Sequence, residues 1–571
     1  MRRSSLSLHG WVLATAAAGL LAGCSDNNNG GGPSGLQPPA GVTVTQTSLT
    51  SATVSWTGAS GATGYLVERA GSDNPGSFAV VGSGVVSATH VDDTGLSGDL
   101  TYSYRVASVS ASDTSAFSSP VSFSFGLHEA TITGDQPITA SRTLFADTVY
   151  KLSGYVKVAS GATLTIQPGT KIIGDSAATG SSLWILRGAK LDAQGTADAP
   201  IVFTSARSPG NRKPGDWGGI IIIGNGTINR TGSPVLTEGG AAGEAEDYSG
   251  GNDDEDDSGT LRYVRIEFAG YDISNGAGQE LNSLSSYAVG HGTTYEYIQT
   301  MSGLDDSFEY WGGRVDGRYL ISYESGDDHF DWTEGYRGRN QFLIAFQSQR
   351  LVPAPNSGVF SADPRGFEGD GCDPGVSGCS IAVGTASTPY SMPVWANFTL
   401  IGPGQLASIP ADGNGSVFRR GTGGTLFNGI MGRWKGIALD IRDEWTDSLF
   451  EQRDSLNIAN LVLAQNGANF DPIGTNFAQE TKFGPANALQ AFTADVAVDT
   501  LLGLSLNPSA LDWTPKAGSP AAAGGSAAVP THFTARTGDF FGGQMEQTTY
   551  IGAADPNGTK WWQGWTAYNI N

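Results

Sequence analysis

Two nine-residue segments carry side chains whose types and spacing could do chemistry. Residues 305–313 read DDSFEYWGG, and residues 327–335, which follow 22 positions later, read DDHFDWTEG. A repeat in the low twenties is typical of one coil of a solenoid, in which equivalent residues of successive coils stack on each other. The repeat therefore predicts carboxylates lying side by side, on six residues: Asp305, Asp306, Glu309, Asp327, Asp328 and Asp331.

Alternation along a strand predicts where these side chains point. If Phe308 and Phe330 point into the core, Glu309 and Asp331 point outward. We expect the residues before each phenylalanine to point outward as well: Ser307 and His329. Each close pair of carboxylates would cost roughly 2–3 kcal/mol at an effective dielectric constant near 20. This row of close carboxylates therefore needs a counter-charge or protons.

Three interpretations of the carboxylates stay open. Carboxylate and carbonyl oxygens suit Ca²⁺, which we expect as the bound cation. A pair of carboxylates could instead catalyse glycan cleavage, with the catalytic groups among Asp305, Asp306, Asp327 and Asp328. The aspartates could also only cap backbone amides, with their charges paired to nearby arginines: Arg314, Arg318, Arg337 and Arg339. Four aromatic residues near these carboxylates could stack on sugar rings: Tyr310, Trp311, Trp332 and Tyr336.

Composition indicates an all-β protein. The chain has 81 glycines among 571 residues, only 15% charged residues, and many short β-branched runs that end in glycine or proline. A net charge of −23 excludes nucleic acid as a partner, because phosphates require basic patches. The elements that must position the carboxylates are therefore strands.

From residue 127 onward the strands follow a coil-like period. Gly161-Ala162-Thr163-Leu164 recurs 27 residues later as Gly188-Ala189-Lys190-Leu191, and Tyr297-Ile298 recurs 22 residues later as Tyr319-Leu320. With ATLTIQPGT at 162–170 and YVRIEFAG at 263–270, this region resembles the pectate-lyase-like superfamily of right-handed parallel β-helices. The resemblance implies that fold over residues 127–571, with lateral loops at 239–259 and 353–380 and a C-terminal cap at about 530–571.

The resemblance implies no agreed activity. Gly290-His291-Gly292 and Gly326-Asp327-Asp328 are similar to motifs of polygalacturonases, which share the fold. In that family the histidine motif follows the aspartate pair, whereas here it precedes it, and further catalytic motifs are missing. The catalytic assignment of that family therefore does not transfer to this chain.

Residues 38–126 are similar to a fibronectin type III domain. A tryptophan on an early strand, Trp56, and a tyrosine strand that begins near Tyr102 carry the resemblance, which implies a sandwich with Trp56 in its core. Such a module is expected to act as a spacer.

The N-terminus predicts export. Arg2, Arg3 and a short apolar stretch end at Leu21-Ala22-Gly23-Cys24, which resembles the lipobox of bacterial lipoproteins. We expect residues 1–23 to be a signal peptide, Cys24 to be lipidated, and residues 24–37 to be a flexible linker; an ordinary signal peptide with a chance cysteine is the alternative. In an exported chain Cys372 and Cys379 are expected to form a disulfide, and a zinc pair is the competing interpretation.

Together these patterns predict a lipid-anchored protein of the bacterial outer membrane, on its cell-surface or periplasmic face, that binds other molecules. An adhesin, or a protein that captures a glycan or another nutrient beside an outer-membrane transporter, is the expected role, with calcium as a possible support. A polysaccharide hydrolase or lyase that uses the stacked carboxylates is the alternative, and a structural envelope protein is the third possibility.

Overall fold

The computed structural model describes residues 35–48, 50–97, 100–379, 387–405, 413–451, 455–471, 482, 488–525 and 540–568. The chain divides into two compact units that meet in the sequence between Phe123 and Ser124. The predicted signal peptide, Cys24 and most of the predicted linker lie outside the described residues. Among the described residues, no helix is long and apolar enough to cross a membrane.

The first unit is a sandwich of two antiparallel sheets. One sheet has the order β1-β2-β5, and the other has the order β4-β3-β6-β7. Trp56 is buried and packs edge-on against Tyr65, with ring centroids 5.3 Å apart, so the predicted burial of Trp56 is confirmed. The strands are β1 (Ala40–Gln46), β2 (Ser51–Thr57), β3 (Gly64–Gly71), β4 (Ala79–Val80), β5 (His90–Thr94), β6 (Thr101–Val109) and β7 (Val121–Ser124).

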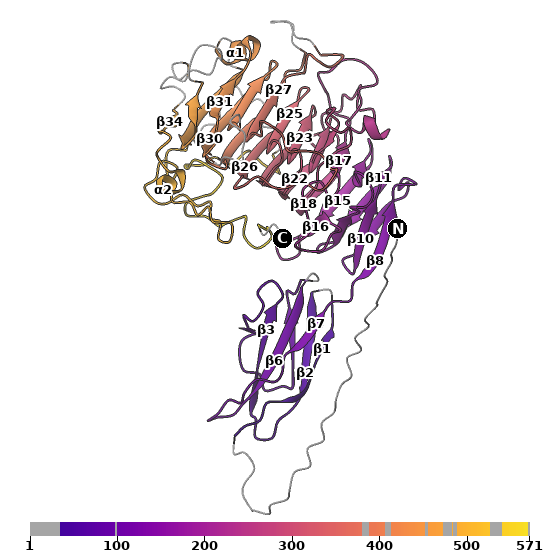
Figure 1. Cartoon of the computed structure of the whole chain (residues 1–571), viewed down its shortest axis with the longest axis vertical. Coiled ribbons are helices and arrows are strands. Elements are labelled where there is room, and N and C mark those ends of the chain that lie inside the picture. The colour runs from indigo at the N-terminus through magenta and orange to yellow at the C-terminus, as the bar shows by residue number, and fades with distance from the viewer. Residues whose placement is uncertain are drawn as a thin grey trace, which may run out of the picture. The chain divides into compact units, whose positions relative to one another are not determined.

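The second unit is a parallel β-helix with two long sheets (Figure 1). The first sheet contains β8 (His128–Thr133), β10 (Thr148–Ser153), β13 (Lys171–Gly174), β16 (Ile201–Ser205), β18 (Gly259–Glu267), β22 (Thr294–Met301), β24 (Asp316–Tyr323), β26 (Arg339–Phe346), β28 (Val394–Ile401), β30 (Gly424–Gly432), β32 (Leu456–Ala464) and β34 (Gln490–Ala491), with a branch of β9 (Arg142–Leu144), β12 (Thr163–Ile166) and β15 (Lys190–Gln194). The second sheet contains β11 (Tyr155–Val158), β14 (Ser182–Ile185), β17 (Gly219–Ile223), β21 (Leu284–Tyr287), β23 (Phe308–Trp311), β25 (Phe330–Thr333), β27 (Phe367–Asp370), β29 (Ser416–Arg419), β31 (Ile437–Ile441) and β33 (Ala468–Phe470).

A few short elements lie outside these sheets. They are the hairpin of β19 (Tyr271–Asp272) and β20 (Glu280–Leu281), the 3₁₀ turn η1 (Gly240–Ala242), and the helices α1 (Glu444–Glu451) and α2 (Val498–Leu502). The chain is therefore almost entirely β-structure, and the predicted fold class is confirmed.

Two strands of the early coils merge into one bent strand in the later coils. β15 pairs with the first half of β18, and β16 pairs with its second half. The bend of β18 lies at Tyr263, whose φ of 49° is left-handed. The equivalent residues of the following long strands are also left-handed: Tyr297, Tyr319, Phe342, Asn397, Asn428 and Asn460. One left-handed residue thus takes the place of the loop between two strands. The two halves of the bent strand form two faces of each later coil, and the strand of the second sheet forms the third face.

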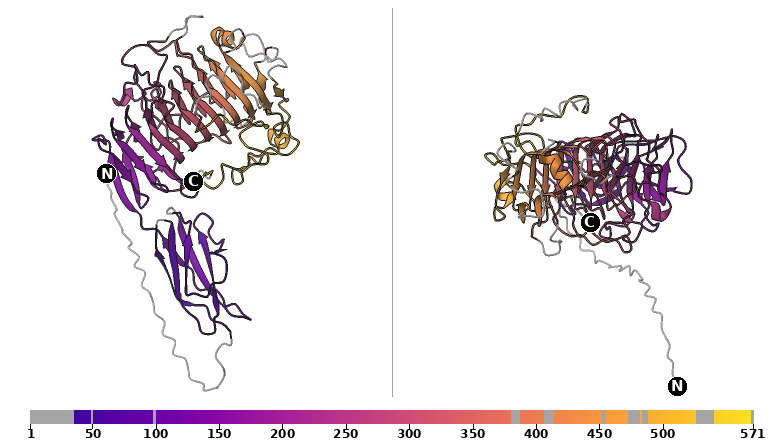
Figure 2. Two further views of the ribbon diagram at one scale, coloured as in Figure 1. Left: turned by 180° about the vertical axis from the view of Figure 1, so that it is seen from behind. Right: turned by 90° about the horizontal axis from the view of Figure 1, so that it is seen from above.

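The aromatic C-terminal segment lies along the side of the β-helix. We expected it to close the open end of the solenoid. Instead, Trp565 packs edge-on against Tyr263 and Tyr297 at centroid distances of 5.7 and 6.1 Å, and Trp561 contacts Tyr319. In Figure 2 the yellow C-terminal segment runs back beside the row of strands. It therefore buries the outer apolar face of the central strands, because that face carries residues such as Ile321, Ile344 and Ile401.

Candidate functional site

The two repeated segments stack in register, as the 22-residue repeat predicted. Strands β23 and β25 pair in parallel, with Phe308 opposite Phe330 and Glu309 opposite Asp331. The two phenylalanine rings stack in the core with centroids 5.2 Å apart. We call the six carboxylates that this register brings together the acid stack: Asp305, Asp306, Glu309, Asp327, Asp328 and Asp331.

The next coil extends the acid stack by a residue that sequence reasoning missed. Asp331 lies opposite Glu368 of β27, which follows Phe367 in the same way that Glu309 follows Phe308. A phenylalanine followed by an acidic residue was the available signal. This signal did not appear in the 22-residue repeat, because the lateral loop makes this coil 37 residues long. Glu368 therefore belongs to the same column of outward carboxylates.

Ser307 and His329 point inward, contrary to the prediction. Ser322 joins them in a buried network, in which its hydroxyl donates to Ser307 at 2.6 Å and lies 2.5 Å from His329 Nδ1. Burial lowers the pKa of His329 to about 3. Alternation fails here because both residues precede the strands and lie in the turn, where the chain changes direction.

Asp306 and Asp328 cap backbone amides of the following coil. The Asp328 N–H donates to Asp306 Oδ1 at 2.7 Å, and the Arg365 N–H donates to Asp328 Oδ1 at 2.6 Å. Asn282 has the same role in the preceding coil, because its Oδ1 accepts the Asp306 N–H at 3.0 Å. The structural role predicted for aspartates at the bends is thus present at these two positions. It leaves the other oxygen of Asp306 available, whereas the other oxygen of Asp328 pairs with Arg365.

Most of the acid stack lacks a basic partner. Among the described residues, Asp328 is the member of the stack that forms an ion pair, with Arg365 at 3.1 Å. One oxygen from each of Asp306, Glu309 and Asp331 lies within 4.8 Å of the others, and the same holds for Asp305, Asp306 and Asp327. Oxygens that share a Ca²⁺ at about 2.3–2.6 Å are separated by at most about 5 Å, so the geometry fits a hard cation.

Burial raises the pKa of the carboxyl groups in the stack. The pKa of Asp327 and of Asp328 rises to about 7, because burial outweighs the lowering effect of Arg365. Burial and the neighbouring carboxylates raise the pKa of Asp305, Asp306, Glu309 and Asp331 well above the ordinary value. At neutral pH these groups therefore need either protons or a cation.

The arginines that pair with Asp328 and with the neighbouring carboxylates of β27 were not predicted. Arg365 pairs with Asp328, Asp363 and Glu368, and Arg419 pairs with Glu368 and Asp370. The four predicted arginines pair elsewhere: Arg314 with Glu255, Arg318 with Glu296, Arg337 with Asp254 and Arg339 with Asp316. They were misplaced because they follow β23 and β25, after the chain has turned toward another face of the coil.

Three of the four predicted stacking residues lie in the core. Tyr310, Trp332 and Tyr336 are at most 1% exposed and pack around Trp395, so they cannot stack on a ligand in this structure. Trp311 differs, because it lines a pocket and stacks on Tyr287 with centroids 4.0 Å apart.

A pocket of about 500 Å³ opens beside the acid stack. Glu309 and Asp331 line it together with three arginines, Arg230, Arg419 and Arg420. Both predicted lateral loops contribute walls, through Tyr248 of the first loop and through Asp373 and Val376 of the second. The disulfide between Cys372 and Cys379 closes the second loop, as the sequence predicted. The pocket also contains Glu238, for which the sequence carried no signal.

Comparisons with known proteins agree with the two units. Residues 136–508 match the model of the pectate-lyase-like β-helix domain, and residues 37–124 match the fibronectin type III domain. No curated protein matches the chain.

Similar solved structures include "Myokine structure" (23% identity, 15% of this chain, 95% of that chain, TM-score 0.14) and the FN5 domain of Drosophila Lar (25%, 15%, 94%, TM-score 0.14). Another is pectate lyase PelI from Erwinia chrysanthemi in complex with tetragalacturonic acid (11% identity, 60% of this chain, 87% of that chain, TM-score 0.14). With TM-scores this low, none of these structures bears on function.

Proposed function

The chain belongs to the pectate-lyase-like β-helix family, and we propose that it is a binding protein whose site lies on the flank of the solenoid, where the two lateral loops line a pocket. A cation held by the acid stack supports the capture of a glycan in the adjacent pocket. Lipidation of Cys24 anchors the protein to the outer membrane, and residues 24–37 hold it away from the lipid surface. This anchoring rests on the sequence alone.

One observation carries the cation. Asp306, Glu309 and Asp331 place three carboxylate oxygens within 4.8 Å of one another, and no ion pair to these three is found among the described residues. Like charges this close destabilise the fold unless they are neutralised. Ca²⁺ takes six to eight oxygen ligands, so carboxylates and water suffice to complete a site.

The pocket composition supports a glycan as the ligand. Trp311, which is 8% exposed, provides apolar surface in the pocket, while carboxylates and arginines around it can hydrogen-bond hydroxyl groups. Pockets of this size accept ligands of one or a few sugar rings. An adhesin and a nutrient-capture protein would use the pocket in the same way, and a co-encoded outer-membrane transporter would favour nutrient capture.

Calcium binding is testable by metal analysis and thermal unfolding. A concentration of Ca²⁺ near 100 times the Kd is expected to stabilise the protein by about 2.7 kcal/mol, or about 3 °C for a unit of this size. The double variant Glu309→Gln, Asp331→Asn should lose this response and the bound metal. Glu129→Gln, which changes an exposed carboxylate on β8, should keep both. If the Tm of the parent protein is the same with and without Ca²⁺, and no calcium is bound, the proposal of a calcium site is wrong.

A glycan-cleaving enzyme is the second candidate, and one observation favours it. Asp327 and Asp328 have a pKa of about 7, where a carboxyl group can act as a general acid at neutral pH. A panel of acidic and neutral polysaccharides should show no turnover if the protein only binds. Turnover that falls at least about 100-fold in Asp327→Asn, but not in Glu129→Gln, would replace binding by catalysis.

A further inference from the structure

The disulfide loop, residues 372–379, forms one side of the pocket beside the acid stack. Asp373 and Val376 of this loop line the pocket. Cys372 and Cys379 are bonded to each other at a sequence separation of 7, so the loop is a small closed ring. The proposed function uses the pocket, but it gives the disulfide no role.

The disulfide loop has no core of its own. Every residue from 373 to 379 is exposed or half-buried. Within the loop, the Val376 N–H donates to the Asp373 carbonyl at 3.1 Å, and the Cys379 N–H donates to the Val376 carbonyl at 3.4 Å. Without buried apolar side chains, the conformation of this segment depends on the disulfide and on polar contacts with its neighbours.

The disulfide loop docks through its backbone on Arg230 and Thr231, which precede the first lateral loop. The Thr231 N–H and the Thr231 hydroxyl both donate to the Gly378 carbonyl at 3.0 Å, and Arg230 Nε donates to the Ser377 carbonyl at 3.0 Å. A Cβ on Gly378 would lie 1.9 Å from the Thr231 carbonyl oxygen, so the two backbones approach too closely for any other residue. The contact therefore requires the loop to keep its shape.

Two arginines that line the pocket use the disulfide loop as a partner. Arg420 pairs with Asp373 at 3.0 Å, and Arg230 donates to the backbone of the loop. Both arginines also pair with a carboxylate outside the loop: Arg420 with Asp370 and Arg230 with Glu334. Release of the loop would therefore expose the two guanidinium groups further without detaching them from the β-helix.

We propose that the disulfide loop is a redox-dependent wall of this pocket. With the disulfide formed, the loop stays docked and holds Arg230 and Arg420 at the pocket. With the disulfide reduced, the loop leaves its docking position and the pocket loses that side. The inference rests on the proposed function for what the pocket captures, but the movement of the wall needs neither calcium nor a glycan.

Reduction needs a dithiol as the electron donor. Cys379 is half-buried and Cys372 is 2% exposed, so the Cys379 sulfur is the one that a thiolate can reach. Attack on Cys379 forms a mixed disulfide and breaks the S–S bond, and Cys372 leaves as a thiolate that takes up a proton. The second thiol of the donor then attacks the mixed disulfide and releases Cys379, which is protonated in turn. The protein thus gains two electrons and two protons, and the donor becomes a disulfide.

The first test compares amide hydrogen exchange in the oxidised protein and in the protein reduced with dithiothreitol and alkylated with iodoacetamide, both in chelator. The Thr231 amide, which donates to the loop, should exchange at least about tenfold faster after reduction. The Asn229 amide is the matched control, because it donates to the Glu334 carbonyl at 2.8 Å and should not change. Equal exchange of the Thr231 amide in the two forms would overturn the proposal.

Variants separate the disulfide from the docking contact. The double variant Cys372→Ser, Cys379→Ser should reproduce the faster exchange of the Thr231 amide without any reagent. Gly378→Ala keeps both cysteines but places a methyl group against the Thr231 carbonyl, so it should release the loop in the oxidised protein. Gly375→Ala is the control in the same loop, because its Cβ would meet only the side chain of Asp373, at 3.2 Å. A Thr231 amide that stays protected in Gly378→Ala would contradict the docking contact.

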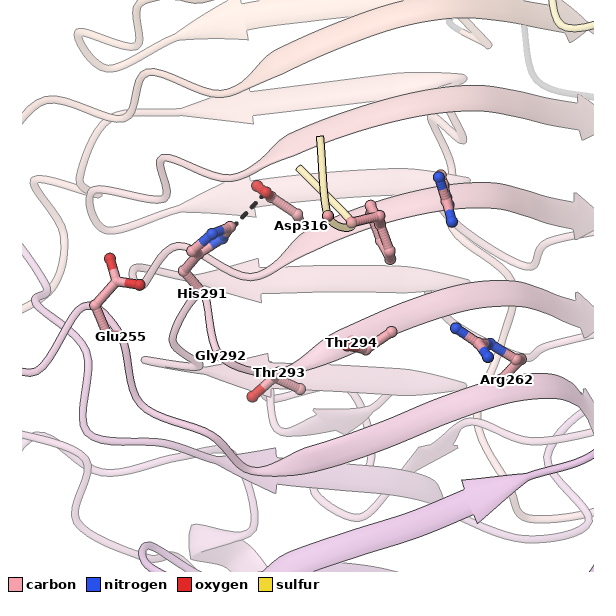
Figure 3. Close-up of a pocket in the computed structure, with 10 residues that line it drawn as sticks. Glu255, Arg262, His291, Gly292, Thr293, Thr294 and Asp316 are labelled. Atoms are coloured by element: carbon pink, nitrogen blue, oxygen red, sulfur yellow. Dashed lines mark ion pairs between the residues drawn. The ribbon is translucent and has the colours of Figure 1, made fainter. Parts of the chain in front are cut away.

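The second test measures the reaction of arginines with phenylglyoxal, by mass spectrometry. Arg230 and Arg420 should react at least about threefold faster in the reduced protein, because they lose their contacts with the loop. Arg262 is the control, since it pairs with Glu296 at 2.5 Å and lines a second pocket, of about 470 Å³, to which the disulfide loop contributes no residue (Figure 3). Unchanged rates at both Arg230 and Arg420 would show that the loop is not a movable wall.

Thermal unfolding distinguishes a local wall from a general staple of the fold. Because the loop opens locally, reduction should change the Tm of the β-helix by less than about 2 °C. Loss of β-structure or a much larger fall in Tm would make the disulfide a global support and overturn the redox wall. If the wall moves but the oxidised protein binds neither calcium nor a glycan, the proposed function is wrong and the movement of the wall stands.

Discussion

Replacing Arg365 with methionine should lower the free energy of unfolding by about 3–5 kcal/mol, which for a unit of this size is about 3–5 °C in Tm. Arg365 has a side chain that is 4% exposed and that pairs with three carboxylates, of Asp328, Asp363 and Glu368. Methionine keeps much of the buried volume but removes the charge. The carboxylates of Asp328 and Glu368 would then stay buried with one cation fewer, which is the costly way to break a buried ion pair, while Asp363 is 37% exposed.

The loss of stability caused by Arg365→Met should depend on pH. Without the guanidinium group, the pKa values of the neighbouring carboxyl groups rise further in the folded state. The destabilisation should therefore be largest near pH 8 and small near pH 4, where these groups are protonated in the folded state with or without Arg365. Thermal unfolding at both values checks this result.

Arg314→Met is the matched control for Arg365→Met. Arg314 pairs with Glu255 at 3.3 Å, and that glutamate is 65% exposed, so the loss should stay below about 1 kcal/mol. Equal losses in the two variants would show that Arg365 is not the main counter-charge of the acid stack.

In chelator the parent protein should be more stable at pH 5 than at pH 8. Asp327 and Asp328 have a pKa of about 7 in the folded state, against an ordinary value of 3.8. Between these values the folded state binds more protons than the unfolded state, so the free energy of unfolding falls as the pH rises toward 7. A rise of about three pKa units corresponds to about 4 kcal/mol for one group.

Calcium should reverse this loss at pH 8 and have little effect at pH 5, because protons compete with the cation for the same oxygens. Unfolding curves at the two pH values, with chelator and with Ca²⁺, measure both effects. Glu309→Gln, Asp331→Asn should flatten the pH dependence and be at least as stable as the parent in chelator. A parent protein that is more stable at pH 8 than at pH 5 in chelator would contradict the electrostatic account of the acid stack.

Much of the fold could be predicted because it depends on local periodicity. Leu164 and Leu191 are paired in adjacent strands, as are Ile298 and Leu320, at the spacings that the sequence repeats. In a parallel coil each residue lies opposite its counterpart one coil later, so the repeat length sets the register directly.

Two kinds of prediction at the candidate site were wrong. In one, the inward and outward alternation of side chains along a strand was not applied; in the other, the residue lies outside a strand and the alternation does not hold. The alternation that sends Glu309 outward also sends Tyr310 inward, so the burial of Tyr310 and Trp332 was already implied by the pattern. The predicted outward direction of His329 was wrong for another reason. This residue lies before its strand, where the period of two no longer holds. The direction of side chains is thus predictable within strands and not at the corners.

The stacked carboxylates follow from the sequence by itself. A phenylalanine followed by an acidic residue, repeated at the length of one coil, places Glu309 beside Asp331 whatever the rest of the chain does. Only the tertiary structure decided which charges face them. Arg365 and Arg419 reach the stack from later coils, and the two lateral loops build the pocket over it. Insertions of irregular length have no period, so the side chains that they and the coils beyond them bring to the site cannot be placed by counting residues.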